Sequence, residues 1–122
     1  MTSPSETTVM VVEDEFLVAA SLEMTLQGAG YSVLEPIPSV EEALEAVTTR
    51  QPADLALLDV NLAGHRVYPV ADALSSRHVP FIFLTGCDED DLPSRFAGAP
   101  LLVKPFSPEK LLHAISQTLG EE

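Results

Sequence analysis

The sequence predicts an α/β fold: a doubly wound parallel sheet of five strands with helices on both faces. Short apolar runs alternate with stretches of helical periodicity, which indicates parallel strands joined by right-handed crossovers. The run from Leu55 to Leu58 is apolar without interruption, as in a strand covered on both faces. Asp59 ends that run and is expected at the carboxyl edge of the sheet, where open α/β folds bind ligands.

The first two strand–helix units are defined by apolar spacing and by breakers. Residues 9–12 are predicted as a strand and residues 16–27 as a helix that glycines end. Residues 31–34 form the second predicted strand. Ser39 and Glu42 then form a capping box for a helix that a later Gln-Pro pair ends. The residues expected on the buried faces of these helices are Val18, Leu22, Leu26 and Ala29, then Val40, Ala43, Leu44 and Val47.

The central units follow the same pattern until the fourth crossover. Strand 55–58 is followed by a loop and by a helix over 68–75, whose proline fits the first turn. Strand 81–84 is followed by an acidic segment, 87–96, which is expected to form one or two helical turns because a proline limits it. The fourth helix is therefore predicted to be shortened or mobile.

The last unit completes the predicted domain. Strand 101–103 precedes a helix that Ser107 caps, with Pro108 at its first position. The buried stripe of this helix is expected to be Leu111, Ile115 and Leu119. A chain of 122 residues fits one domain, 1–122, whose residues 1–7 are expected to be frayed.

Composition disfavours several classes of function. Nineteen acidic and six basic residues give a net charge of −13, which argues against binding nucleic acid or anionic membranes. The single cysteine, Cys87, excludes an intrachain disulfide. No apolar run approaches the roughly 20 residues of a membrane span, and the N-terminus lacks the regions of a signal peptide. We expect a cytoplasmic monomer or weak dimer.

Five polar residues follow the ends of four predicted strands. They are Glu13, Asp14, Asp59, Thr85 and Lys104. Because the carboxyl ends of parallel strands share one edge, these side chains are expected to converge. Three carboxylates together repel one another unless a cation lies between them, and Mg²⁺ prefers such oxygen ligands.

This set of residues fits phosphoryl transfer, which depends mainly on positioning and charge neutralisation. The carboxylate of Asp59 can act as a nucleophile and form an acyl phosphate. The ammonium group of Lys104 can pair with a phosphoryl oxygen, and the hydroxyl of Thr85 can donate to another.

Four short motifs carry a resemblance to a known family. They are Val11-Val12-Glu13-Asp14, Leu57-Leu58-Asp59, Phe83-Leu84-Thr85-Gly86 and Val103-Lys104-Pro105-Phe106. Over roughly residues 8–119 the chain resembles the receiver domain of bacterial two-component response regulators. The resemblance implies a flavodoxin-like (βα)5 topology.

The resemblance also implies a role for each residue. Asp59 is implied as the phosphoacceptor, Thr85 as the switch hydroxyl and Lys104 as the phosphate-pairing lysine, with a cis bond before Pro105. The implied Mg²⁺ ligands are Glu13, Asp14, Asp59 and the backbone carbonyl of Asn61. The implied donor is a sensor histidine kinase or a histidine phosphotransfer protein. Signalling would proceed by protein contacts, as a shuttle, a sink or a kinase regulator.

Several positions depart from the family pattern. Leu101 stands where an aromatic switch residue is usual, Gly86 follows the switch hydroxyl, and the loop after the acceptor is atypical. Asn61 and Cys87 occupy the positions where the family tunes the phosphoryl lifetime. These traits are similar to a Phe-x-Thr-Gly subgroup of single-domain receivers associated with atypical sensor kinases. We therefore expect residues 86–98 to be mobile and to become ordered on phosphorylation.

Two other functions remain open. A degenerate receiver would act as an interaction module without phosphorylation. A haloacid-dehalogenase-like phosphatase also uses an aspartate nucleophile, but it carries a second acid two residues later, where this chain has Asn61. Taken alone, Glu13 and its acidic neighbours would more simply be a solvated helix start.

The first helix carries apolar residues beyond its core stripe. They are Phe16, Leu17, Ala20 and Met24. A wide buried face is the favoured interpretation. The alternative is a docking surface for the phosphoryl donor beside the site, because the first helix of receivers commonly meets the histidine donor.

Overall fold

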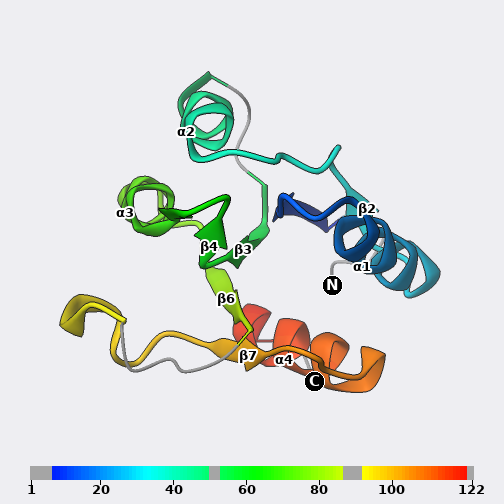
Figure 1. The fold of residues 1–122 in the computed structure, drawn as a ribbon. Coiled ribbons are helices and arrows are strands. Elements are labelled where there is room, and N and C mark those ends of the chain that lie inside the picture. The colour runs from blue at the N-terminus through cyan, green and yellow to red at the C-terminus, as the bar shows by residue number, and fades with distance from the viewer. Residues whose placement is uncertain (1–6, 50–52, 87–91, 121–122) are drawn as a thin grey trace.

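A five-stranded parallel sheet forms the centre of the computed structural model, which describes residues 7–49, 53–86 and 92–120. Its strands are β1 Thr8–Val12, β2 Ser32–Val33, β3 Leu55–Asp59, β6 Phe81–Thr85 and β7 Leu101–Val103. The order across the sheet is β2-β1-β3-β6-β7, and each neighbouring pair is parallel (Figure 1). The predicted doubly wound, flavodoxin-like topology is therefore confirmed.

Four helices cover the two faces of the sheet. They are α1 Phe16–Gly28, α2 Val40–Thr49, α3 Tyr68–Ser76 and α4 Pro108–Leu119. Helices α1 and α4 lie on one face, and α2 and α3 lie on the other (Figure 1). Alternation along β3 divides the core, because Leu57 packs with α1 and α4 whereas Leu58 packs with α2 and α3. The strand ends are thereby held between two buried apolar layers.

Local chemistry sets the ends of the helices as predicted. Before α2, the Ser39 hydroxyl donates to the Glu42 carboxylate at 2.9 Å and accepts from the Glu42 amide at 3.2 Å. Before α4, the Ser107 hydroxyl accepts from the Lys110 amide at 3.1 Å. Gly120 ends α4 in the left-handed region, at a φ of 76°.

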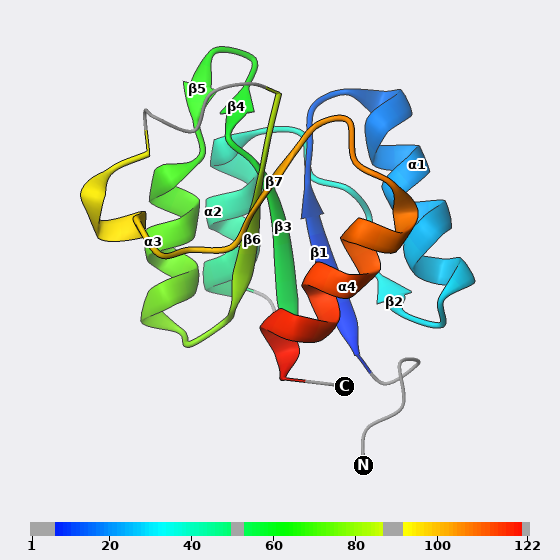
Figure 2. The same cartoon turned by 90° about the horizontal axis from the view of Figure 1, so that it is seen from below.

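The loop predicted after β3 is instead a small hairpin. Its strands are β4 Asn61–Leu62 and β5 His65–Arg66, which pair antiparallel and lie beside the ends of the sheet strands (Figure 2). Ala63 and Gly64 join them with φ values of 51° and 91°. A two-residue turn with two positive φ angles matches the twist of a hairpin, although alanine is an unusual residue at its first position.

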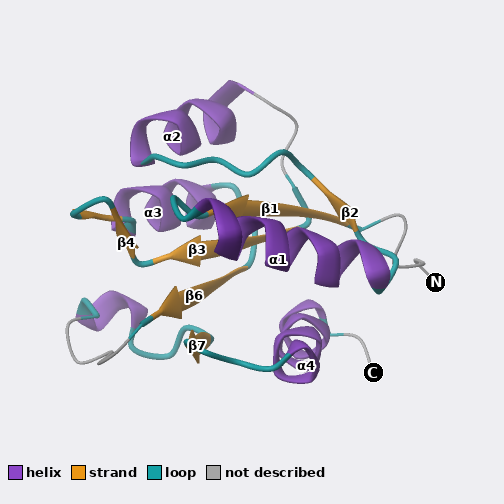
Figure 3. Ribbon diagram, turned by 45° about the vertical axis from the view of Figure 1, so that its right-hand side comes forward, coloured by secondary structure: helices purple, strands orange, loops and turns teal. Residues whose placement is uncertain are grey.

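The expectation of a wide buried face on α1 is wrong. Phe16 and Leu17 are 82% and 80% exposed, and Met24 is 74% exposed. The buried residues of α1 form one narrow stripe, which consists of Ala19, Leu22 and Leu26. Figure 3 shows α1 crossing one face of the sheet with its other side uncovered. The predicted core stripe does pack against the sheet. Apolar residues continue around much of this helix, so its periodicity does not show where the buried face stops.

The fourth crossover carries little helix within its described part. Residues 92–100 contain one 3-10 turn, η2 Ser94–Phe96, in agreement with the predicted shortened fourth helix. Residues 87–91, including Cys87, lie outside the described residues, as does most of the frayed N-terminus that the sequence predicts. No helix among the described residues is long and apolar enough to cross a membrane.

Candidate functional site

Strand register brings the predicted site residues to one edge of the sheet. Val12 of β1 pairs with Leu58 of β3. The next residues, Glu13 and Asp59, therefore lie side by side at the ends of these two strands. Asp59 in turn pairs with Leu84, which places Thr85 at the next strand end. Lys104 follows β7, and its amide donates to the Thr85 carbonyl at 2.7 Å.

Three carboxylates gather at this edge. Glu13, Asp14 and Asp59 each offer an oxygen, and these oxygens lie within 4.8 Å of one another. Glu13 and Asp59 are buried, at 2% and 6% exposure, whereas Asp14 faces solvent. Oxygen donors of this kind, converging from two neighbouring strand ends with one side open, fit a hard divalent cation.

Lys104 supplies the positive charge that faces these acids. Its ammonium nitrogen lies 3.0 Å from Oε1 of Glu13 and 3.6 Å from Oδ2 of Asp59. The peptide bond between Lys104 and Pro105 is cis, as the resemblance implied. The side chain of Lys104 is 19% exposed, so this pairing is only partly screened by water.

The environment of Asp59 favours its protonated form. Burial, then the charge of Glu13 and a hydrogen bond with that residue, raise the pKa of Asp59 from 3.8 to about 7. Lys104 and the Asn61 amide act in the opposite direction. Burial lowers the pKa of Lys104, but its hydrogen bond to Glu13 and the surrounding acids outweigh burial and raise that pKa overall. A cation at the site would favour the ionised form of Asp59.

The β4–β5 hairpin is attached to the site through backbone amides. The Ala63 amide donates to Oδ2 of Asp14 at 3.0 Å, and the Asn61 amide lies 3.4 Å from Oδ1 of Asp59. The side-chain oxygen of Asn61 accepts from the Gly64 amide at 3.1 Å, inside the hairpin. This attachment was not predicted from the sequence, although Gly64 in a short polar loop is the kind of residue that such turns use.

Leu101 packs at the place where an aromatic residue was expected. It pairs with Phe83 across β6 and β7 and lies half-buried against the core. Four rings lie in the same core layer. They are Tyr68, Phe81, Phe83 and Phe96, and the centroids of the rings in contact lie 5.2–6.0 Å apart. Aromatic packing is therefore present in this layer, on elements other than β7.

Comparison with known proteins gives one family over nearly the whole chain. Residues 9–116 match the family model described as the response regulator receiver domain. The chain is 34% identical over 116 residues to the phyllosphere-induced regulator PhyR of Methylorubrum extorquens, covering 93% of this chain and 43% of PhyR. It is 31% identical to the phosphate regulon transcriptional regulatory protein PhoB of Pseudomonas aeruginosa, covering 92% of this chain and 51% of PhoB. The chain thus spans about half the length of these curated relatives.

Solved structures agree with the fold. The solution structure of SdrG from Sphingomonas melonis Fr1 is 38% identical, with a TM-score of 0.83, and the match covers 98% of this chain and 99% of SdrG. A CheY-like receiver domain protein from Methanospirillum hungatei JF-1 is 26% identical, with a TM-score of 0.82 and coverage of 93% and 94%.

Proposed function

Because the chain belongs to the response regulator receiver domain family, whose members are phosphoaccepting signalling modules and not turnover enzymes, we propose that Asp59 accepts a phosphoryl group. The donor is a histidine kinase or a histidine phosphotransfer protein, since receiver domains interact with such kinases. The observation that carries the proposal is the convergence of Asp59 with two further acids and Lys104 at one sheet edge.

The chemical step follows from this arrangement. A carboxylate oxygen of Asp59 attacks phosphorus, and a new O–P bond forms as the P–N bond of phosphohistidine breaks. The released imidazole nitrogen keeps the bonding electron pair. Lys104 favours the attacking carboxylate form and lies where it can pair with a phosphoryl oxygen. Thr85, at the adjacent strand end, is assigned the hydroxyl that donates to the phosphoryl group.

Glu13, Asp14 and Asp59, with the backbone carbonyl of Asn61, are the proposed Mg²⁺ ligands. The fit rests on their hard oxygen donors, which converge within 4.8 Å, and on a partly buried setting in which burial and the charge of Glu13 raise the pKa of Asp59. Bound Mg²⁺ would neutralise charge that develops on the phosphoryl group.

Residues 1–122 are proposed to act as one receiver in the cytoplasm, passing the signal by protein contacts as a shuttle, a sink or a kinase regulator. Phe16, Leu17 and Met24 form an exposed apolar surface on α1, which begins three residues after Glu13. A surface of this kind beside the acceptor suits the docking of the phosphoryl donor.

Incubation with acetyl phosphate and Mg²⁺, followed by intact mass measurement, tests this function against its competitors. A phosphoryl adduct that requires Mg²⁺ and is lost in Asp59→Asn supports the receiver. An unmodified protein that still binds its partners supports a degenerate interaction module. Turnover of phosphate esters supports a phosphatase, which is disfavoured because Asn61 occupies the position of the second acid.

A further inference from the structure

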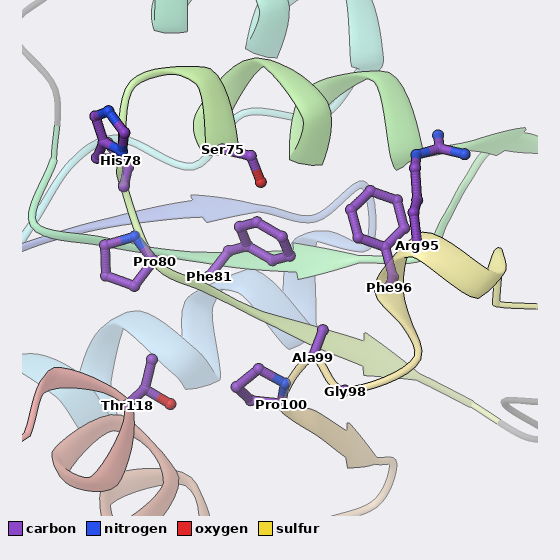
Figure 4. A pocket seen from close by; sticks show the side chains of 11 residues that line it. Ser75, His78, Pro80, Phe81, Arg95, Phe96, Gly98, Ala99, Pro100 and Thr118 are labelled. Carbon is purple, nitrogen blue, oxygen red and sulfur yellow. The ribbon is translucent and has the colours of Figure 1, made fainter.

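A cavity lies at the amino edge of the sheet, opposite the carboxylates. Its volume is about 630 Å³, which lies within the usual range of ligand sites. Pro80 and Pro100, which precede β6 and β7, line it together with residues from the ends of α3 and α4 (Figure 4). We call this cavity the amino-edge groove.

The groove exposes part of the sheet face over β6 and β7. Helices α2 and α3 cover this face elsewhere, but residues 92–100 of the fourth crossover contribute only the η2 turn. The ring of Phe96, on that turn, packs edge-on against Phe81 and Phe83, at centroid distances of 6.0 and 5.3 Å. Phe81 remains half-buried. The groove therefore has an aromatic wall, and no helix of the described residues lies over it.

The charge of the groove differs from that of the chain. In the part of the chain that the structure describes, none of the eleven lining residues is acidic, although the chain has nineteen acids and six bases. Figure 4 shows His78 and Arg95 at opposite ends of the groove, with the rings of Phe81 and Phe96 between them. The rings suit apolar groups of a ligand, and Arg95 suits an anionic group, so the surface is complementary to a ligand that carries both.

The guanidinium group of Arg95 is fixed by contacts with Asp72 and Phe96. Its Nε and Nη2 donate to Asp72 at 3.0 and 2.9 Å, and its guanidinium carbon lies 4.7 Å from the centroid of the Phe96 ring. The side chain is still 55% exposed, and Asp72 accepts from only two of its five N–H groups. A fixed guanidinium loses little conformational entropy when it binds a second anion.

We propose that the amino-edge groove binds an amphipathic helix of a partner protein, with apolar side chains against Phe81 and Phe96 and carboxylates toward Arg95. A helix fits because the groove opens on the face of the sheet, beside α3, and not along the β7 edge where an added strand would pair. This interaction goes beyond phosphoryl transfer and uses none of the residues assigned to it.

The probe is a synthetic helical peptide of about 15 residues, long enough to form a helix, with a leucine stripe flanked by glutamates. A matched peptide carries glutamine in place of each glutamate. Backbone amide shifts of the full chain are followed during titration at about 0.15 M salt, which screens the net charge of the chain. We expect shifts at the groove residues and an affinity at least tenfold higher for the glutamate peptide. Shifts confined to α1, or equal affinity for both peptides, would overturn the proposal.

Variants separate binding from folding. A Cβ atom added at Gly98, which lines the groove, meets nothing within 4 Å, so the backbone there has room for a larger side chain, and Gly98→Leu adds bulk at the groove. Gly28, at the end of α1, is equally open, and Gly28→Leu is the matched control. We expect Gly98→Leu to weaken peptide binding at least tenfold and Gly28→Leu to leave it unchanged. Arg95→Gln should remove the preference for glutamate, whereas Asp72→Asn should keep or increase it. Wild-type binding by Gly98→Leu would contradict the proposal.

Discussion

The ammonium nitrogen of Lys104 lies 3.0 Å from Oε1 of Glu13, although ninety-one positions separate the two residues in the chain. Lys104 thereby faces both buried acids of the site, since Asp59 lies 3.6 Å away. The ends of β1 and β3, which the sequence predicted to converge, are thus bridged by the Lys104 ammonium group.

Removal of the Lys104 charge should slow phosphorylation. In Lys104→Gln, the acids lose the group that lowers the pKa of Asp59, and the phosphoryl group loses its pairing cation. We expect phosphorylation by acetyl phosphate to fall by about 100- to 1,000-fold, as when one electrostatic group is removed from an active site. Lys110→Gln, on the exposed side of α4, is the control. An unchanged rate in Lys104→Gln would exclude this role.

Stability without metal should fall as the pH rises from about 4 to about 7. The pKa of Asp59 is raised on folding from 3.8 to about 7, so the folded state binds more protons than the unfolded state in that interval. The stabilisation that comes from protonated Asp59 is fully present below pH 4 and is lost as the pH rises through 7. Urea unfolding in EDTA at several pH values measures it.

Asp59→Asn should flatten that pH dependence. Because a tenfold change in proton affinity corresponds to about 1.4 kcal/mol, we expect the variant to be more stable than the wild type by roughly 1–3 kcal/mol at pH 8. At pH 4 the two proteins should differ little. Parallel pH profiles for both would show that Asp59 is not the titrating group.

The exposed face of α1 should affect transfer from a protein donor but not chemistry at Asp59. Phe16→Asp should change the free energy of unfolding by less than about 0.5 kcal/mol, because Phe16 is 82% exposed. It should slow phosphotransfer from a histidine kinase while acetyl phosphate still reacts at the wild-type rate. His113→Asp, exposed on α4, controls for added charge. Equal slowing with both donors would place Phe16 in the site chemistry instead of the docking surface.

Tyr68 carries a buried hydroxyl that has no hydrogen-bond partner among the described residues. Its ring stacks on Phe96, with centroids 5.9 Å apart. Since burial of an unpaired hydroxyl costs about 1–3 kcal/mol, Tyr68→Phe should leave stability unchanged or raise it by up to about 1 kcal/mol. Thermal unfolding tests this, with Tyr31→Phe as the comparison. A clear loss of stability in Tyr68→Phe would show that the hydroxyl has a partner in solution.

The sequence predicted the strand ends well because two independent signals coincide there. An apolar run must be buried, and a polar residue at its end must reach the edge of the sheet, so Asp59 could be placed without coordinates. The partners of Asp59 followed from the parallel order of the strands. Their protonation could not be predicted, because it depends on the burial of Glu13 and on the distances to Lys104.

The hairpin and the face of α1 could not be predicted for different reasons. Each hairpin strand has two residues, too few for an alternating pattern, and Ala63 takes a conformation that usually belongs to glycine or asparagine. On α1 the apolar residues continue beyond the predicted core stripe, so the sequence places Leu22 in the core but only packing reveals that Phe16 is exposed. The amino-edge groove could not be predicted from the sequence either, since its walls come from four separate elements.

The identity of the acceptor residue is the most direct test of the proposed function. Borohydride reduces an acyl phosphate to an alcohol, which converts a phosphorylated aspartate to homoserine. After reaction with acetyl phosphate and Mg²⁺, borohydride treatment and peptide mass spectrometry locate that residue. We predict homoserine at position 59 and none in a sample prepared with EDTA. Reduction products at Asp14 or elsewhere, with Asp59 unmodified, would contradict the account.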